Sequence, residues 1–347
     1  MIWLPSSKKR GYQQIVLTYS PLTTKVSYQP TETSKLLIIR RFYLPGHNLF
    51  HQLEKFPLFN FLYITPVLLI NSIIWLISNQ HRIDVIHSHG LNAAIIGNLL
   101  KPIFRISRHI TSIYSTYDNV PFNSLSTRLL VACLNRTNHI LTQTNQSIQQ
   151  LITLGVNKEN ISRYYHWIDI HRFKPVSQKK SPFSILFIGR MIPSKNAILL
   201  ATVARKLPQI IFNFIGTGPQ YPLLQTLSKK YPNIVLLGDI PYIELHRYYQ
   251  SNSLLCLPSL NQEGWGRVLA ESVACGTPVI CSDRGGTIEA IDTTVAIIIN
   301  PTVNNFYKSI KSLFESQHQL QNLQSHCRPY ALKHYSSDNI SYITRHY

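Results

Sequence analysis

The stretch Glu263-Gly-Trp-Gly-Arg-Val-Leu-Ala-Glu271, followed by Ser-Val-Ala-Cys-Gly-Thr-Pro-Val-Ile, is the most informative part of the chain. A strand is expected just before it, and Gly264 and Gly266 allow the backbone of the connecting loop to approach a ligand closely. A helix is expected to begin near Arg267, and its N–H groups and positive dipole end would attract an anion. Glu271, one turn further on, can reach a hydroxyl pair such as that of a ribose.

A plainer interpretation of the same stretch is that Glu263 caps the helix and Glu271 is a surface residue. The two glycines that flank Trp265 and the Cys-Gly-Thr-Pro turn after the helix argue against it. The pattern therefore favours a binding site for a phosphorylated ligand.

A second group of residues follows an earlier predicted strand. Gly189 comes directly after the strand expected at Phe183–Ile188, and the next loop carries the cations Arg190 and Lys195. Arginine makes a forked contact with phosphate, and lysine supplies a point charge. Together with the helix start, these cations would place positive charge on two sides of a diphosphate. A third glycine turn, at residues 216–218, lacks the dinucleotide-binding GxGxxG pattern.

Short β-branched segments alternate with amphipathic segments along the whole chain, which is typical of parallel strands joined by helices. In the first part, strands are expected at Gln14–Thr18, Leu36–Arg40, Asp84–His87, His109–Tyr114 and His139–Thr142. Helices are expected there at Asn92–Leu100, Leu125–Leu134 and Gln146–Leu154.

A polar, proline-bracketed stretch over 173–182 reads as a linker to a second alternation. Its strands are expected at Phe183–Ile188, Ile210–Ile215, Ile234–Leu237, Leu254–Leu257, Pro278–Cys281 and Ala296–Ile299. Its helices are expected at Asn196–Lys206, Tyr221–Lys230, Tyr242–Gln250, Val268–Ala274 and Thr287–Ile291. The prediction is an α/β chain of two doubly wound Rossmann-like domains facing a cleft, with ligands at the carboxyl ends of strands.

Composition supports two cores and limits the partners. The chain has 347 residues, 44% of them apolar, which suits two domains and excludes a disordered protein. The net charge of +19 attracts phosphate in nucleic acid, anionic lipid or a nucleotide. The five cysteines form no CxxC pair and no metal-ligand spacing, which is typical of reduced thiols in the cytosol. No signal peptide is expected at the start.

One apolar segment is long enough to cross a membrane. From Phe56 to His81 no side chain carries a fixed charge, and Leu62–Ile77 is strongly apolar. Two asparagines and Pro66 interrupt the run, and Pro66 is expected to divide it into two amphipathic pieces, the second being Val67–Ile77. A buried or surface-lying helix is favoured over membrane insertion, and a helix lying in the lipid interface is the intermediate alternative.

The block from Phe187 to Ile291 resembles the donor-binding domain of the retaining GT-B glycosyltransferases of family four, the group 1 glycosyl transferases. In that family two glutamates separated by seven residues mark the nucleotide-sugar site, and an arginine and a lysine clasp the diphosphate. The matching residues here are Glu263 and Glu271, then Arg190 and Lys195, then Gly216 and Gly218 for the strand-end turn and Gly285–Glu289 for a later motif.

The resemblance continues upstream with less specific motifs. Asp84–Gly90 resembles the segment that brings a histidine, here His89, to the catalytic cleft, whereas His87 is expected to point the other way. The resemblance implies domains at 1–172 and 173–329, with a helix over 330–347 crossing back to the first. The family opens with a strand, a glycine-rich loop and a helix before the segment that Arg10–Leu17 resembles, so the first domain is expected to be N-terminally shortened.

The resemblance implies transfer of a hexose from a nucleotide diphosphate sugar to a glycan or lipid-linked acceptor, with retention, in cell-envelope polysaccharide or lipopolysaccharide synthesis. It implies a cytoplasmic enzyme, at the inner face of the cytoplasmic membrane if it makes a peripheral membrane contact. The implied catalytic residues are Glu263, His89, Arg190 and Lys195. The implied donor-binding residues are Gly189, Arg190, Lys195, Gly216, Gly264, Trp265, Gly266 and Glu271.

No metal ion or other cofactor is expected, because the sequence has no DxD pair and no His/Cys cluster at ligand spacing. Two alternatives stay open. A nucleotide-sugar-binding remnant without turnover would fit the missing N-terminal loop. A nucleic-acid binder is suggested only by charge and is disfavoured, since no aromatic-and-basic stacking motif accompanies it.

Overall fold

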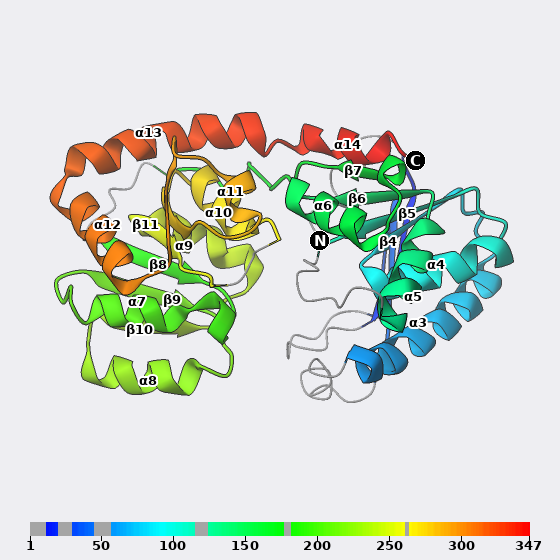
Figure 1. The fold of residues 1–347 in the computed structure, drawn as a ribbon, viewed down its shortest axis with the longest axis horizontal. Helices are drawn as coiled ribbons and strands as arrows, with labels where there is room; N and C mark the ends of the chain where they lie inside the picture. Colours follow the sequence, from blue (N-terminus) through cyan, green and yellow to red (C-terminus); the bar gives the residue numbers. More distant parts are fainter. Residues whose placement is uncertain (1–11, 20–29, 45–56, 115–123, 177–181, 261–263) are drawn as a thin grey trace. The chain divides into compact units, whose positions relative to one another are not determined.

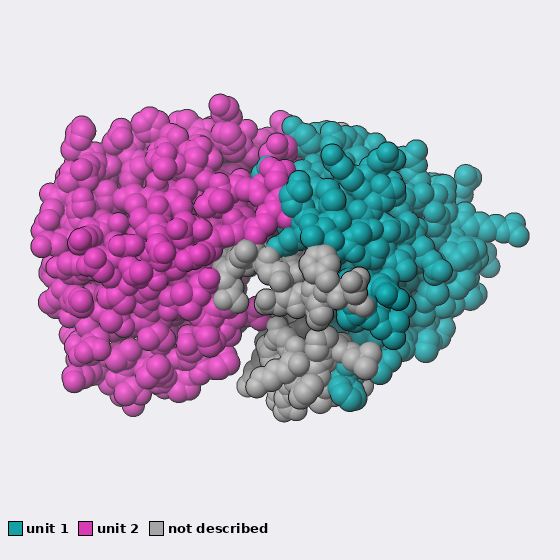
Figure 2. Space-filling view, viewed as in Figure 1, with its two compact units in different colours: residues 1–142, 147–164, 340–347 teal, residues 143–146, 165–339 magenta. Residues whose placement is uncertain are grey.

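A computed structural model describes residues 12–19, 30–44, 57–114, 124–176, 182–260 and 264–347. The chain divides into two compact units, coloured separately in Figure 2. The first unit comprises residues 1–142, 147–164 and 340–347, and the second comprises residues 143–146 and 165–339. The main crossing between units therefore follows Tyr164, ahead of the stretch that reads as a linker in the sequence. Phe173, at the start of that stretch, is fully buried in the core of the second unit.

The described residues of the first unit form two small sheets. In one, β1 (Gln14–Tyr19) is parallel to β3 (Leu37–Phe42), and β2 (Thr31–Ser34) is antiparallel to β3. The other is fully parallel and runs in the order β4 (Val85–His89), β5 (Arg108–Ile113), β6 (His139–Thr142) and β7 (Ile161–Arg163). The connecting helices are α4 (Leu91–Ile103), α5 (Leu125–Asn135) and α6 (Asn145–Leu154) (Figure 1).

The apolar segment before β4 forms one helix, α3 (Pro57–Asn79), so the expected division at Pro66 is wrong. Proline removes one backbone hydrogen bond from a helix. Buried side chains on both sides of it, Ile64 and Leu76, hold the two halves in place. Within the described residues, Phe61–Asn79 is the one helical stretch whose length and apolar composition suffice to cross a membrane.

The second unit is built on a six-stranded parallel sheet (Figure 1). Its strands are β8 (Ser184–Ile188), β9 (Ile211–Ile215), β10 (Ile234–Gly238), β11 (Leu254–Leu257), β12 (Val279–Ser282) and β13 (Ala296–Ile299). Its helices are α7 (Ala197–Ala204), α8 (Tyr221–Lys230), α9 (Leu245–Ser251), α10 (Arg267–Ala274), α11 (Thr287–Ala290), α12 (Val303–Glu315) and α13 (Gln317–His334). The expected alternation of strands and helices is thus present in this unit.

The strand order β10-β9-β8-β11-β12-β13 fixes where a ligand belongs. The chain moves outward from β8 to β10 and then returns to place β11 beside β8. This reversal is a topological switch point, and open α/β sheets bind ligands at the carboxyl ends of the strands that border it. The strands in question, β8 and β11, are the two that precede the glycine and cation motifs.

The end of the chain differs from expectation. The single helix expected over 330–347 is wrong, because α13 ends at His334 and is followed by the 3-10 helix η4 (Ser337–Ile340) and by α14 (Ser341–Thr344). Tyr335 marks the break, and its hydroxyl donates to the carbonyl of Ala290. Residues 340–347 belong to the first unit.

Candidate functional site

The loops that follow β8 and β11 are joined directly. The short 3-10 helix η2 (Pro193–Lys195) follows β8, and the backbone N–H of Leu260, after β11, donates to the carbonyl of Ser194 at 2.8 Å. Arg190 is exposed and Lys195 is half-buried. The structure therefore brings the loop that carries both cations against the loop that leads to the α10 helix start.

Glycines at the strand ends are required by the backbone itself. Gly216 has a φ of 122°, and a Cβ placed there would overlap the carbonyl oxygen of Gly189. The N–H of Gly189 in turn donates to the carbonyl of Ile215 at 3.1 Å. The glycine at 216 thus permits close packing of the β8 and β9 ends. Donor contacts by Gly189 and Gly216 stay predictions.

Helix α10 begins at Arg267, where the sequence predicts the start of a helix. Gly266 is its N-cap residue, in the left-handed region with a φ of 73°. Gly264 lies close to Gly286, where a Cβ would overlap the Gly264 carbonyl oxygen, so the loop after β12 packs against the loop before α10. The first N–H groups of an α-helix lack intrahelical partners and can bind an anion. Glu263, the expected sugar-binding carboxylate, lies outside the described residues.

Glu271 is buried, with 2% of its side chain exposed. The Nε of Arg267 is 2.8 Å from its Oε1, and the Tyr249 hydroxyl donates to its Oε2 at 2.9 Å. Burial raises the pKa of the Glu271 carboxyl, and Arg267 and Tyr249 oppose that rise. Both carboxylate oxygens therefore already have protein partners. The predicted ribose contact would have to exchange or share one of them.

Sequence reasoning missed the partners of Glu271. Arg267 lies four residues before it on α10, a spacing at which opposite charges meet on a helix, so this pair had a readable signal. The guanidinium of Arg267 also lies over the Tyr242 ring, 4.5 Å from its centroid. Tyr242 and Tyr249 come from the segment between β10 and β11, and no local pattern in the sequence indicates that they reach α10.

Trp265, an expected donor-binding residue, is 6% exposed and packs in the hydrophobic core. Its ring makes edge contacts with His166 at 4.9 Å and Tyr335 at 5.4 Å, measured between centroids. Burial, with a smaller effect of Arg267, lowers the pKa of His166 to about 3. The predicted contact of Trp265 with the donor would therefore be made by its backbone atoms.

Two histidines of the first unit, His87 and His89, lie together at the end of β4. The rings of His87 and His89 stack with their centroids 4.5 Å apart, so the expectation that His87 points away from His89 is wrong. Residues two apart on a strand share a face, and Ser88 between them points to the other side, where its hydroxyl lies 2.8 Å from His109. The alternation along β4 therefore separates Ser88 from the two histidines.

Hydrogen bonds hold these two rings. The Nε2 of His87 is 2.7 Å from the Ser112 hydroxyl, its Nδ1 is 2.9 Å from the Tyr347 hydroxyl, and the Nδ1 of His89 is 2.5 Å from the Tyr114 hydroxyl. Burial by surrounding protein atoms lowers the pKa of His89 to about 4, although part of the side chain is exposed. Neutral imidazole, able to accept a proton or a hydrogen bond, is therefore the form at neutral pH.

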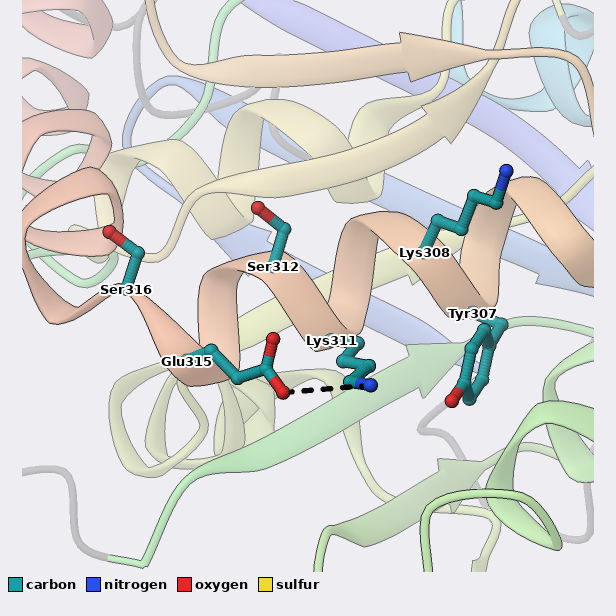
Figure 3. Close-up of a pocket in the computed structure, with 6 residues that line it drawn as sticks. All are labelled: Tyr307, Lys308, Lys311, Ser312, Glu315 and Ser316. Atoms are coloured by element: carbon teal, nitrogen blue, oxygen red, sulfur yellow. Dashed lines mark ion pairs between the residues drawn. The ribbon is translucent and has the colours of Figure 1, made fainter.

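Other candidate sites in the described part of the chain are weak. A shallow hollow lies along α12, where Lys311 and Glu315 form an ion pair at 3.7 Å (Figure 3). No strand-end loop contributes to it. Its lining residues all come from α12 or its C-terminal end and are Tyr307, Lys308, Lys311, Ser312, Glu315 and Ser316. Among the described residues, no three His, Cys, Asp or Glu side chains gather in a way that could hold a metal ion. The strand-end loops of the second unit remain the main candidate site.

Two family models match the chain. Residues 168–334 match the glycosyl transferases group 1, and residues 8–172 match glycosyltransferase family 4. Together the matches cover both units, and the strand order of the second unit agrees with a doubly wound domain of the GT-B fold. The chain therefore belongs to the group 1 glycosyltransferases of the family 4 type.

Relatives with known names are distant. The phosphatidylinositol N-acetylglucosaminyltransferase gpi3 subunit of Schizosaccharomyces pombe is 22% identical over 293 residues, which cover 78% of this chain and 60% of the relative. The Escherichia coli O-antigen biosynthesis glycosyltransferase WbnH is 23% identical over 223 residues, which cover 64% of this chain and 57% of the relative. The chain thus spans less than two thirds of the length of either relative.

Solved structures share the fold. Sucrose-phosphate synthase from Thermosynechococcus elongatus superposes with a TM-score of 0.77 at 18% identity, covering 98% of this chain and 89% of that one. Anabaena HepE in complex with UDP-glucose superposes with a TM-score of 0.72 at 17% identity, covering 88% of this chain and 85% of that one. These likenesses establish two Rossmann-like domains of the GT-B type.

Proposed function

We propose that this protein transfers a hexose from a nucleotide diphosphate sugar to a glycan or lipid-linked acceptor, with retention of the anomeric configuration. The observation that carries the proposal is the join between two loops at the switch point of the second unit. The hydrogen bond from Leu260 to Ser194 ties the loop of Arg190 and Lys195 to the loop that begins α10. Two sources of positive charge thereby lie at one edge of the sheet.

In this proposal the charge on the departing diphosphate is stabilised by Arg190, Lys195 and the N–H groups at the start of α10. Each preorganised donor of this kind contributes about 3–4 kcal/mol to the transition state, or roughly a hundredfold to a thousandfold in rate. Glu263 would hold the sugar hydroxyls in position, and Glu271 would bind the ribose. The proposal assigns the diphosphate charge to these groups and requires no metal ion.

A uridine diphosphate hexose is the first donor to test. The support is limited to the fold neighbour HepE, whose structure contains UDP-glucose. We also propose an acceptor in cell-envelope polysaccharide or lipopolysaccharide synthesis, reached at the inner face of the cytoplasmic membrane, and the O-antigen biosynthesis relative supports the choice of a glycan acceptor. His89 is proposed to contact the donor sugar or the acceptor as a neutral imidazole.

The test is a donor screen that follows release of nucleotide diphosphate, run with the wild type, Arg190→Ala and Lys195→Ala. Each variant should turn over at least about tenfold more slowly, with its circular dichroism spectrum unchanged. Lys229→Ala, which removes an exposed cation at the end of α8, serves as the control and should keep the wild-type rate. A chelator should leave the wild-type rate unchanged.

The outcomes separate the alternatives. Unchanged rates in both Arg190→Ala and Lys195→Ala would remove the diphosphate assignment. Nucleotide-sugar binding with no release of nucleotide diphosphate from any donor or acceptor would favour a binding remnant. Tight binding of an oligonucleotide with a steep salt dependence, in place of nucleotide binding, would favour the nucleic-acid alternative.

A further inference from the structure

The outward stripe of α3 is apolar. Its exposed side chains recur at every third or fourth residue and so lie in one line along the helix. The stripe consists of Leu62, Pro66, Ile70, Ile74 and Ile77. Its four large aliphatic side chains keep 55%, 56%, 58% and 62% of their surface exposed, in chain order. A solvent-facing helix normally carries polar residues on such a line, so this composition indicates a surface that binds something.

The opposite side of α3 is fixed to the first unit. Leu76 is buried in a cluster with Ile96 and Leu100 of α4, and Ile64 is buried in a neighbouring cluster. Yet only 22% of the apolar window of α3 is buried, unlike a core helix. A helix held along one side and open along the other is suited to lie on a bilayer, since crossing it would require release from α4.

The charges around α3 select the kind of surface. α4 packs against both α3 and α5, so the three helices form one layer. None of the three contains Asp or Glu. The helices of this layer carry Lys101 on α4 and the exposed Arg128 on α5, and the exposed Arg105 and Arg136 lie just after α4 and α5, respectively. The three helices therefore combine exposed apolar side chains with positive charge and carry no acidic side chain.

The neighbouring helices repeat the pattern. Leu99 and Ile103 of α4 are 45% and 55% exposed, and Leu125 and Leu129 of α5 are 74% and 63% exposed. Arg128 lies between the two leucines of α5 in sequence. Apolar side chains with adjoining cations match a lipid interface, where acyl chains accept the former and anionic headgroups the latter.

We propose that the outward stripe of α3, flanked by the cations of α4 and α5, docks this protein on an anionic lipid surface. The net charge of +19 favours the same partner. A second copy of this chain is disfavoured as the occupant, because a two-fold interface through this layer would bring its cations against each other. The inference goes beyond sugar transfer and stands or falls separately from it.

The experiment is co-sedimentation of the full chain with phosphatidylcholine vesicles, with and without phosphatidylglycerol. The wild type should bind the anionic vesicles and be released by high salt. The double variant Ile70→Glu/Ile74→Glu should lower the association constant for these vesicles at least about tenfold, because two negative charges would be placed against the lipid. The matched control is Leu223→Glu/Ile243→Glu, two residues of the second unit that are 52% and 60% exposed, which should bind like the wild type.

Folding and donor binding are read in parallel. Since Ile70 and Ile74 are exposed, the double variant should keep the wild-type urea midpoint and the wild-type affinity for UDP, whether or not sugar transfer occurs. The proposal would be overturned if this variant bound anionic vesicles as well as the wild type, or if the control variant lost as much vesicle binding as this variant. It would also be overturned if high salt and alkaline extraction failed to release the membrane-bound protein. A concentration-dependent dimer that the Ile70→Glu/Ile74→Glu variant abolishes, without vesicle binding by the wild type, would also overturn it and assign the stripe to a second copy.

Discussion

Removal of the Arg267 guanidinium should leave a buried carboxylate without its counter-ion. The substitution Arg267→Met keeps much of the side-chain volume but removes the charge 2.8 Å from Glu271, whose side chain is 2% exposed. Breaking a buried ion pair on one side costs about 3–5 kcal/mol. Because Arg267 keeps 40% of its side chain exposed, water screens the pair, and we expect about 2 kcal/mol.

A double-mutant cycle separates the pair from its surroundings. Arg267→Met, Glu271→Gln and the combination should give a coupling of about 1 kcal/mol or more, since the neutral amide that replaces the carboxylate no longer needs a cation. In Arg267→Met the pKa of the Glu271 carboxyl, already raised by burial, should rise further. The Glu271 carboxyl then binds a proton more tightly in the folded state than in the unfolded state. The variant's loss in free energy of unfolding, relative to the wild type, is therefore present at neutral pH and shrinks as pH falls.

The assay is urea unfolding followed by tryptophan fluorescence, at neutral pH and at mildly acidic pH. Lys311→Met supplies the control, because Lys311 and Glu315 have the same four-residue spacing but are 45% and 60% exposed. That control should change the free energy of unfolding by less than about 0.5 kcal/mol. A coupling near zero for Arg267 and Glu271, or a deficit that grows on acidification, would refute the reasoning.

Two other predictions rest on backbone packing and histidine burial. Gly216→Ala should lower the free energy of unfolding by at least about 2 kcal/mol, because the φ of Gly216 is 122° and the new Cβ would overlap Gly189. Gly238→Ala should lower it by only about 1 kcal/mol, because Gly238 has a φ of 70° and open space around it. Similar losses for the two variants in urea unfolding would contradict this prediction. Burial lowers the pKa of His109 to about 4, so the native state binds fewer protons than the unfolded state and stability should fall as pH drops below about 6.5. By pH 5 the titration of His109 alone should lower the free energy of unfolding by about 2 kcal/mol. The variant His109→Gln should therefore lose less stability on acidification, as measured by urea unfolding at several pH values.

The sequence by itself determined the alternation of strands and helices in the second unit and the position of the motifs at strand ends. Strands β11 and β13 begin and end where the short apolar runs do, because parallel strands covered on both faces read as continuous apolar segments. The α10 start at Arg267 was also readable, since Gly266 supplies the left-handed residue that precedes it.

Other elements gave no local signal. β2 consists of Thr31, Glu32, Thr33 and Ser34, all exposed, so it has no hydrophobic alternation and exists through pairing with β3. Pro66 indicated a helix break, yet burial on both sides of it outweighs one missing hydrogen bond. In both cases packing with distant residues decided what the local sequence left open.

Only the tertiary structure decided how the candidate site is assembled. The return of β11 to the side of β8 places Arg190 and Lys195 on a loop hydrogen-bonded to the one that leads to α10, and the enclosure of Glu271 by Arg267 and Tyr249 joins two helices. Residue type and spacing reflect propensities that act within a few turns of chain. Strand order and the partners of a buried charge depend on the free energy of long-range packing, which no short stretch of this sequence contains.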